Sequence, residues 1–220
     1  MLGTDLLAGH PEAGAVLAVL APGQGAQRQG FLGDWLTLSG FEGRLKSLSD
    51  AAGVDLLTAG TTMSDENISD TAIAQPLIVG AGLATLPELS VDPAGCVTAG
   101  HSVGEFTAAA AAGILTDRAA IQLIRARAAA MAMASAATPS GMAAILGGDE
   151  AEVLAAIDAA GCVAANFNCA GQVVAAGPTA ALERLVAAPP SGARVRPLAV
   201  AGAFHTDLMA SEKDALADVA

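Results

Sequence analysis

The chain of 220 residues contains no tyrosine, one tryptophan and five phenylalanines, so aromatic residues make up only 3% of it. Proteins that hold single-stranded nucleic acid stack the bases on aromatic side chains, and this composition disfavours such binding. Basic residues are also scarce, because ten lysines and arginines oppose twenty-two acidic residues and leave a net charge of −12. Such a charge repels phosphate backbones at long range. Nucleic-acid binding is therefore excluded as a function.

Cysteine is scarce too, and the three thiols (Cys96, Cys162 and Cys169) are too scattered for a disulfide framework or a CxxC zinc pair. We expect no metal site and a reducing, cytoplasmic environment. The first residues lack a basic segment, so they do not resemble a signal peptide. No uninterrupted apolar run reaches about 18 residues, so we expect no membrane span.

The abundant residues are apolar, at 53% of the chain, which is ample for a packed core. Residues 15–21 (AVLAVLA) form a continuous apolar run that predicts a central strand buried on both faces of a parallel sheet. Residues 97–99 predict a second strand, followed by a helix over 105–112. A longer helix is expected from about 117 to 135, and a proline-containing helix over 71–86.

After Pro139 the pattern changes to short segments in the order β-α-β-β-α-β, which is typical of a ferredoxin-like unit. We assign residues 137–200 to this insert, and residues 1–136 and 201–220 to an α/β core. A helical pattern over 207–220 has no stop signal, and the core has only two or three expected strands. The sequence is therefore expected to be the front part of a longer protein, truncated at its C-terminus.

The segment Gly100-His101-Ser102-Val103-Gly104 matches G-x-S-x-G, a strained strand-to-helix turn that projects a serine nucleophile. Its place between an apolar strand and an alanine-rich helix fits that mechanism. The free N–H groups of a helix start would stabilise developing negative charge. The alternative is a glycine-rich turn in which Ser102 only caps the helix.

A serine nucleophile needs a base, and the chain has only three histidines. His10 lies in an irregular leader, and His101 neighbours the serine, so its side chain is expected to point away. His205 is left by elimination as the base. The alternative is that His205 is a buried histidine with a structural hydrogen-bond partner.

Arg127 falls in the middle of the apolar stripe of the long helix, when successive residues are placed 100° apart. A guanidinium in that position needs an anionic partner, since an unpaired buried charge is costly. The partner is either a structural carboxylate, such as that of Glu105, or an acidic group of the substrate. The sequence leaves both open.

The glycine-rich turn over 22–27 (PGQGAQ) lacks the third glycine of a dinucleotide-binding loop, and no P-loop lysine follows it. We therefore expect no nucleotide cofactor. A loop at the end of a buried strand can instead offer backbone N–H groups to an oxyanion.

Taken together, the segments resemble the malonyl-CoA:acyl carrier protein transacylases of bacterial fatty-acid synthesis, especially those of actinobacteria. The resemblance rests on APGQGAQ (21–27), TAIAQPLIVGAG (71–82), AGHSVGEFTAAAAAGIL (99–115), GMAAILGG (141–148), ANFNCAGQVVAAG (165–177) and VAGAFHTDLM (200–209). It implies a hydrolase-like parallel-sheet core that carries a ferredoxin-like insert. The family continues beyond the last residue of this chain.

The resemblance also implies roles for individual residues. Ser102 would be the nucleophile and His205 its base. The backbone N–H groups of Gln24 and Val103 would form the oxyanion hole, and Arg127 would bind the malonyl carboxylate in a bidentate manner.

Three further residues match family positions near the pocket: Gln75, Asn166 and Asn168. Phe204 would narrow the pocket beside the base. Ala128 departs from the family, which commonly has glycine after the arginine.

The resemblance implies malonyl transfer from coenzyme A to the phosphopantetheine thiol of an acyl carrier protein, through a malonyl-serine intermediate. Malonyl-CoA is then a substrate and no cofactor is needed. The alternatives are a serine hydrolase or thioesterase of related fold, an acyltransferase of polyketide-synthase type, and an inactive fragment that serves as an interaction module.

Overall fold

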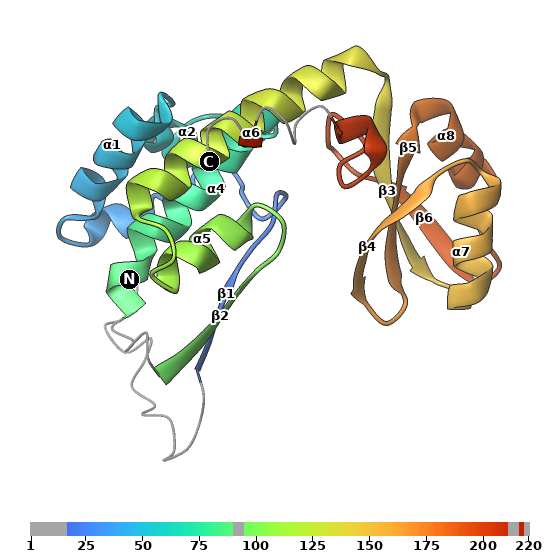
Figure 1. Ribbon diagram of the computed structural model, residues 1–220, viewed down its shortest axis with the longest axis horizontal. Coiled ribbons are helices and arrows are strands. Elements are labelled where there is room, and N and C mark those ends of the chain that lie inside the picture. Colours follow the sequence, from blue (N-terminus) through green and yellow to red (C-terminus); the bar gives the residue numbers. More distant parts are fainter. Residues whose placement is uncertain (1–16, 90–94, 211–215, 218–220) are drawn as a thin grey trace. The chain divides into compact units, whose positions relative to one another are not determined.

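The computed structural model describes residues 17–89, 95–210 and 216–217 of the chain (Figure 1). The expected N-terminal leader over residues 1–14, including His10, lies outside the described residues. The chain divides into two compact units, residues 1–128 and residues 129–220.

The first unit is mainly helical and contains one small parallel sheet. Its elements are β1 (Leu17–Ala21), η1 (Asp34–Thr37), α1 (Phe41–Ala52), α2 (Leu56–Thr61), α3 (Asp65–Ile68), α4 (Thr71–Thr85), η2 (Leu86–Leu89), β2 (Cys96–Gly100), α5 (Gly104–Ala111) and the beginning of α6 (Asp117–Ala137). Strands β1 and β2 pair in parallel, with Ala21 opposite Gly100 at their carboxyl ends. The segments that follow the two strands therefore begin side by side.

The expectation that the first strand is buried on both faces is wrong for the described structure. Leu20 is 74% exposed, and Val97 of β2 is 57% exposed. Helix α5 packs against both strands, and among the described residues only β2 pairs with β1. An apolar run signals the capacity for burial, whereas burial on two faces also requires elements that cover both.

Helix α4 lies at the centre of the helical core of this unit. The carboxylate of Asp70 caps it by accepting a hydrogen bond from the N–H of Ala72. Two glycines allow close helix packing, because a Cβ at Gly80 would press on Leu56 and a Cβ at Gly82 on Thr107. The stretch Thr71–Leu89 has the length and composition of a membrane span, but most of α4 is buried in this core. It is a core helix.

The second unit contains an antiparallel sheet and two helices. Its elements after α6 are β3 (Ser140–Gly147), α7 (Glu150–Ala159), β4 (Val163–Cys169), β5 (Gln172–Pro178), α8 (Thr179–Ala187), β6 (Ala193–Pro197) and the short 3-10 helix η4 (Asp207–Met209). The strands lie in the order β4-β5-β3-β6, and every neighbouring pair is antiparallel. The β-α-β-β-α-β order of elements predicted from the sequence is confirmed.

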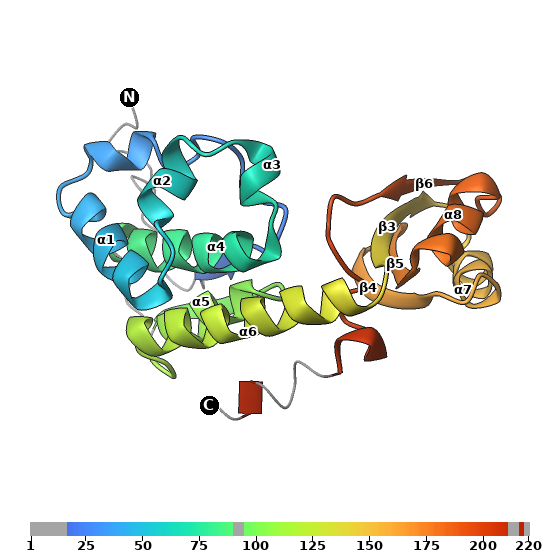
Figure 2. The same cartoon turned by 90° about the horizontal axis from the view of Figure 1, so that it is seen from above.

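The two faces of this sheet are covered differently. Helices α7 and α8 cover one face, where they pack on side chains such as Ile145 and Val173 (Figure 2). The opposite face carries Met142 and Val174, and Phe204 packs there with them. The segment around residue 204 is therefore held on the sheet face that the helices leave open.

The helix expected over residues 207–220 is only partly described. Asp207–Met209 form a single 3-10 turn, and residues 211–215 and 218–220 lie outside the described residues.

Candidate active site

The backbone at Ser102 has the strained conformation that a nucleophile elbow requires. Its φ angle is +53°, in the left-handed region that residues with a Cβ rarely adopt. Strand β2 ends at Gly100 and helix α5 begins at Gly104, so Ser102 lies at the apex of the turn between them. A serine that only capped the helix would not need this conformation, and the described start of α5 at Val103 has no side-chain cap bond. The geometry favours the nucleophile interpretation.

Two glycines make this turn sterically possible. A Cβ at Gly100 would overlap the backbone of Gly104 and Glu105. A Cβ at Gly104 would overlap the carbonyl oxygen of Ala21 at the end of β1. The G-x-S-x-G spacing therefore reflects close approach of backbone to backbone on both sides of the serine.

The elbow is tied to the segment that follows β1. The N–H of His101 donates to the carbonyl oxygen of Ala21 at 3.0 Å. Gly23 passes so close to the imidazole of His101 that a Cβ there would overlap Nδ1. The glycine-rich turn and the serine turn thus lie against each other at the carboxyl ends of two parallel strands, where α/β sheets commonly bind ligands.

Gln27 holds the glycine-rich turn in place. Its Oε1 accepts from the N–H of Gly25 at 2.8 Å, and its Nε2 donates to the carbonyl oxygen of Ile68 at 3.2 Å. The sequence interpretation named Gln24 in this turn and missed Gln27. The second glutamine of GQGAQ was the available signal, since a glycine-rich turn needs side-chain bonds to hold one shape.

The turn and the helix start leave two backbone donors available. Within residues 17–89 and 95–128, the N–H groups of Gln24 and Val103 donate no hydrogen bond to another described residue. Val103 is 1% exposed, and the amide oxygen of Gln24 is buried without a hydrogen-bond partner among the described residues. Buried polar groups are normally satisfied, so these atoms mark a place where a ligand or water belongs.

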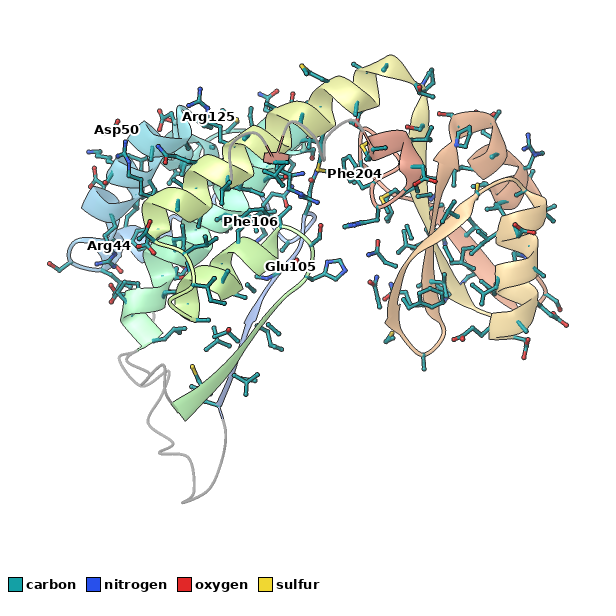
Figure 3. All side chains as sticks on the ribbon, in the orientation of Figure 1. Arg44, Asp50, Glu105, Phe106, Arg125 and Phe204 are labelled. Atoms are coloured by element: carbon teal, nitrogen blue, oxygen red, sulfur yellow. The ribbon has the colours of Figure 1, made fainter. Side chains whose placement is uncertain are left out.

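Arg127 makes a hydrogen bond to a buried amide in the same unit. Its Nη1 donates to Oε1 of Gln75 at 3.0 Å, joining α6 to α4. Gln75 is 1% exposed, and Arg127 is half-buried. The helical stripe correctly placed the arginine inward, while Glu105, the carboxylate considered as its structural partner, is exposed near the start of α5 (Figure 3).

In the second unit, His205 also has a left-handed backbone, with φ of +62°. It is exposed, whereas Phe204 before it is 6% exposed and packs among Met131, Met142 and Met209. The exposed side chain does not fit the alternative of a buried structural histidine. Phe204 is a core side chain of this unit, so any influence on a pocket would act through the packed cluster.

The two asparagines lie on strand β4, which is irregular at both positions. Asn166 is half-buried and pairs with Val174, so it shares the sheet face on which Phe204 packs. Asn168 is exposed and falls in the second register shift of the strand.

The predicted site residues thus divide between the two units. Residues 24, 75, 102, 103 and 127 belong to the first unit, and residues 166, 168, 204 and 205 to the second. Among the described residues, no group of three histidine, cysteine or acidic side chains could hold a metal ion.

Comparison with known proteins identifies relatives over nearly the whole chain. The Acyl transferase domain family matches residues 19–219. The malonyl CoA-acyl carrier protein transacylase of Mycobacterium tuberculosis H37Rv is 49% identical over 209 residues, which are 93% of this chain and 69% of that protein.

Solved structures agree with this match. The crystal structure of MCAT from Mycobacterium tuberculosis superposes with a TM-score of 0.88 at 48% identity, over 93% of this chain and 69% of that one. A malonyl-transacylase solved in complex with its type II PKS acyl-carrier protein has a TM-score of 0.82 at 33% identity, again over 93% and 69% of the two chains.

Proposed function

The chain belongs to the malonyl CoA-acyl carrier protein transacylase family of acyl transferases, and we propose a role for each candidate residue in that reaction. The activity is transfer of a malonyl group from malonyl-CoA to an acyl carrier protein in fatty-acid synthesis. The observation that carries the residue assignment is the left-handed backbone of Ser102 at the end of β2.

In the first half-reaction, Ser102 Oγ attacks the thioester carbonyl carbon and its proton passes to the imidazole of His205. The carbonyl oxygen becomes an oxyanion, which accepts hydrogen bonds from the N–H groups of Gln24 and Val103. The carbon–sulfur bond then breaks, and the thiolate of coenzyme A takes the proton from the imidazolium. The product is a malonyl ester of Ser102.

The second half-reaction reverses these steps with another thiol. The phosphopantetheine thiol of the carrier protein gives its proton to His205 and attacks the ester carbonyl. When the oxyanion collapses, the bond between the carbonyl carbon and Ser102 Oγ breaks, the imidazolium of His205 returns the proton to Oγ, and the malonyl thioester of the carrier protein is released. The type II PKS acyl-carrier protein in the solved complex of a relative supports this choice of acceptor.

Arg127 would recognise the free carboxylate of the malonyl group. The guanidinium carries five N–H donors in a rigid plane, so it can hold Gln75 and still present a bidentate pair to a carboxylate. Because Gln75 is fully buried, we assign it to orienting the arginine.

The remaining residues and the fold assignment extend the proposal. Asn166 and Asn168 would line the pocket, and Phe204 would shape it through the packing of the His205 segment. The strand order of the second unit supports a ferredoxin-like insert over 137–200, carried by a hydrolase-like core of 1–136 and 201–220. A cytoplasmic location fits the carrier-protein substrate.

A transfer assay tests the function and separates it from hydrolysis. The chain is mixed with malonyl-CoA and a phosphopantetheinylated carrier protein, and the products are resolved by mass spectrometry. Malonyl-carrier protein that forms only in the presence of unmodified Ser102 supports the proposal. Steady release of malonate would identify a hydrolase, and no product would identify an inert chain.

A further inference from the structure

His205 adopts a backbone conformation that needs support from its surroundings. A φ of +62° is unfavourable for a residue with a Cβ, and such conformations persist only where neighbouring contacts fix them. The His205 side chain is exposed. The residues on either side of His205 make hydrogen bonds that restrain the backbone at this position.

Thr206 makes two of these contacts. Its hydroxyl donates to the carbonyl oxygen of Ala203 at 2.7 Å and accepts from the N–H of Leu208 at 3.2 Å. The two bonded groups lie before and after His205 in the chain. One hydroxyl therefore ties together the backbone on both sides of the histidine.

Ser140 anchors the same segment to the sheet. Its Oγ accepts from the N–H of Ala203 at 3.2 Å, and Ser140 is the first residue of β3. Gly202 fits closely against Ser135, whose Oγ a Cβ at 202 would overlap. Ala203 is thus held through its N–H by Ser140 and through its carbonyl by Thr206.

We propose that Thr206 is a positioning residue for His205, and that Ser140 anchors the same segment to the sheet through Ala203. This inference rests on the proposed role of His205 as the base. Without the Thr206 hydroxyl, the carbonyl of Ala203 and the N–H of Leu208 both lose their partner. The backbone at residue 205 can then relax from the left-handed region, and this change rotates the imidazole away from the orientation in which it acts as the base.

The expected effect is on the rate of proton transfer and not on substrate binding. A displacement of about 1 Å in a catalytic group can cost about 100-fold in rate. We therefore expect Thr206→Val to lower the rate of Ser102 acylation by about 10- to 100-fold. Thr206→Ser keeps the hydroxyl and should stay within about threefold of the unmodified chain.

A matched control is available in the first unit. The hydroxyl of Thr61 donates to the carbonyl oxygen of Leu57 at 2.6 Å, in α2. Thr61→Val removes the same kind of bond in the other unit, at a residue with no proposed role in the reaction. It should leave the acylation rate unchanged, even if it lowers the melting temperature as much as Thr206→Val does.

The experiment uses p-nitrophenyl acetate as a probe that acylates a serine without needing a malonyl carboxylate. Ser102 Oγ displaces p-nitrophenolate, and the size and rate of the burst are followed by absorbance across a range of pH. The unmodified chain should show a burst that depends on Ser102 and rises with deprotonation of one imidazole. In Thr206→Val the burst should be slow and nearly independent of that ionisation, with an unchanged KM.

The outcomes separate this inference from the function. An equal burst and pH profile in the unmodified chain and in Thr206→Val would overturn the positioning role. So would equal losses in Thr206→Val and Thr61→Val, since that pattern reports stability alone. The same chains are then offered malonyl-CoA. A Thr206-dependent burst without malonyl uptake would refute the malonyl-transfer proposal and leave the positioning role supported.

Discussion

Arg127 provides the sharpest test of how the chain selects its acyl group. The arginine is half-buried on α6, and its Nη1 donates to the amide oxygen of Gln75, which is 1% exposed. A malonyl carboxylate would pair with this oriented guanidinium through two charge-assisted hydrogen bonds. An acetyl group has no carboxylate, so it would bury part of the guanidinium without that partner.

The size of the effect follows from the difference between these two states. Truncating one partner of a buried, hydrogen-bonded charge pair costs about 2–5 kcal/mol. At about 1.4 kcal/mol for each factor of ten, this is about 30-fold to about 4,000-fold in preference for malonyl over acetyl. Arg127→Ala should remove most of that preference, with malonyl transfer falling steeply and acetyl transfer constant or higher.

Arg125 offers a matched control on the same helix. It is exposed, and its guanidinium lies against Gly53 at the end of α1. Arg125→Ala removes one arginine from α6 and the same amount of positive charge, so it should leave the preference unchanged. Both variants and the unmodified chain are given equal mixtures of malonyl-CoA and acetyl-CoA, and the two acyl-enzymes are quantified by intact mass. Equal loss of both acyl groups in Arg127→Ala would show that this arginine is structural.

Two further predictions concern packing and thiol chemistry. Gly104→Ala should lower the free energy of unfolding by about 1–3 kcal/mol, because its Cβ would overlap the carbonyl of Ala21. Gly43→Ala, which has open space around a Cβ in α1, should raise the free energy of unfolding by about 0.5–1 kcal/mol. Urea unfolding measures both changes, and equal effects of the two variants would contradict the close approach of Gly104 to Ala21. Burial raises the pKa of the Cys162 thiol, partly offset by the charge of Arg184, so iodoacetamide at neutral pH should alkylate the exposed Cys169 much faster. Peptide mass mapping that found Cys162 labelled first would contradict the buried position.

Local signals in the sequence predicted much of the second unit and the elbow. Asp149 before α7 and the glycine after α5 mark helix ends, and the structure shows the Asp149 carboxylate accepting from two backbone N–H groups. The spacing of Gly100 and Gly104 around Ser102 predicted the strand-to-helix turn. These features depend on a few neighbouring residues, so the sequence carries them directly. The family that the motifs indicated is confirmed by the match over residues 19–219.

Features that depend on distant residues were harder to predict. The bond between Arg127 and Gln75 joins residues 52 positions apart, and the helical stripe gave the direction of the arginine without its partner. The exposure of Leu20 depends on which elements cover the sheet, and the sequence of the strand alone does not specify those elements. His205 has a left-handed backbone, and Thr206 makes hydrogen bonds on either side of it. Individual hydrogen bonds of this kind leave no periodic pattern in the sequence.

The central claim is that Ser102 carries the malonyl group, and mass spectrometry tests it directly. The chain is incubated briefly with malonyl-CoA, quenched in acid and digested, and the peptide that contains residues 99–115 is sequenced. We expect the mass of one malonyl group on Ser102, its loss when a phosphopantetheinylated carrier protein is added before the quench, and no adduct in Ser102→Ala. An adduct on another residue, or one that persists in Ser102→Ala, would contradict the account.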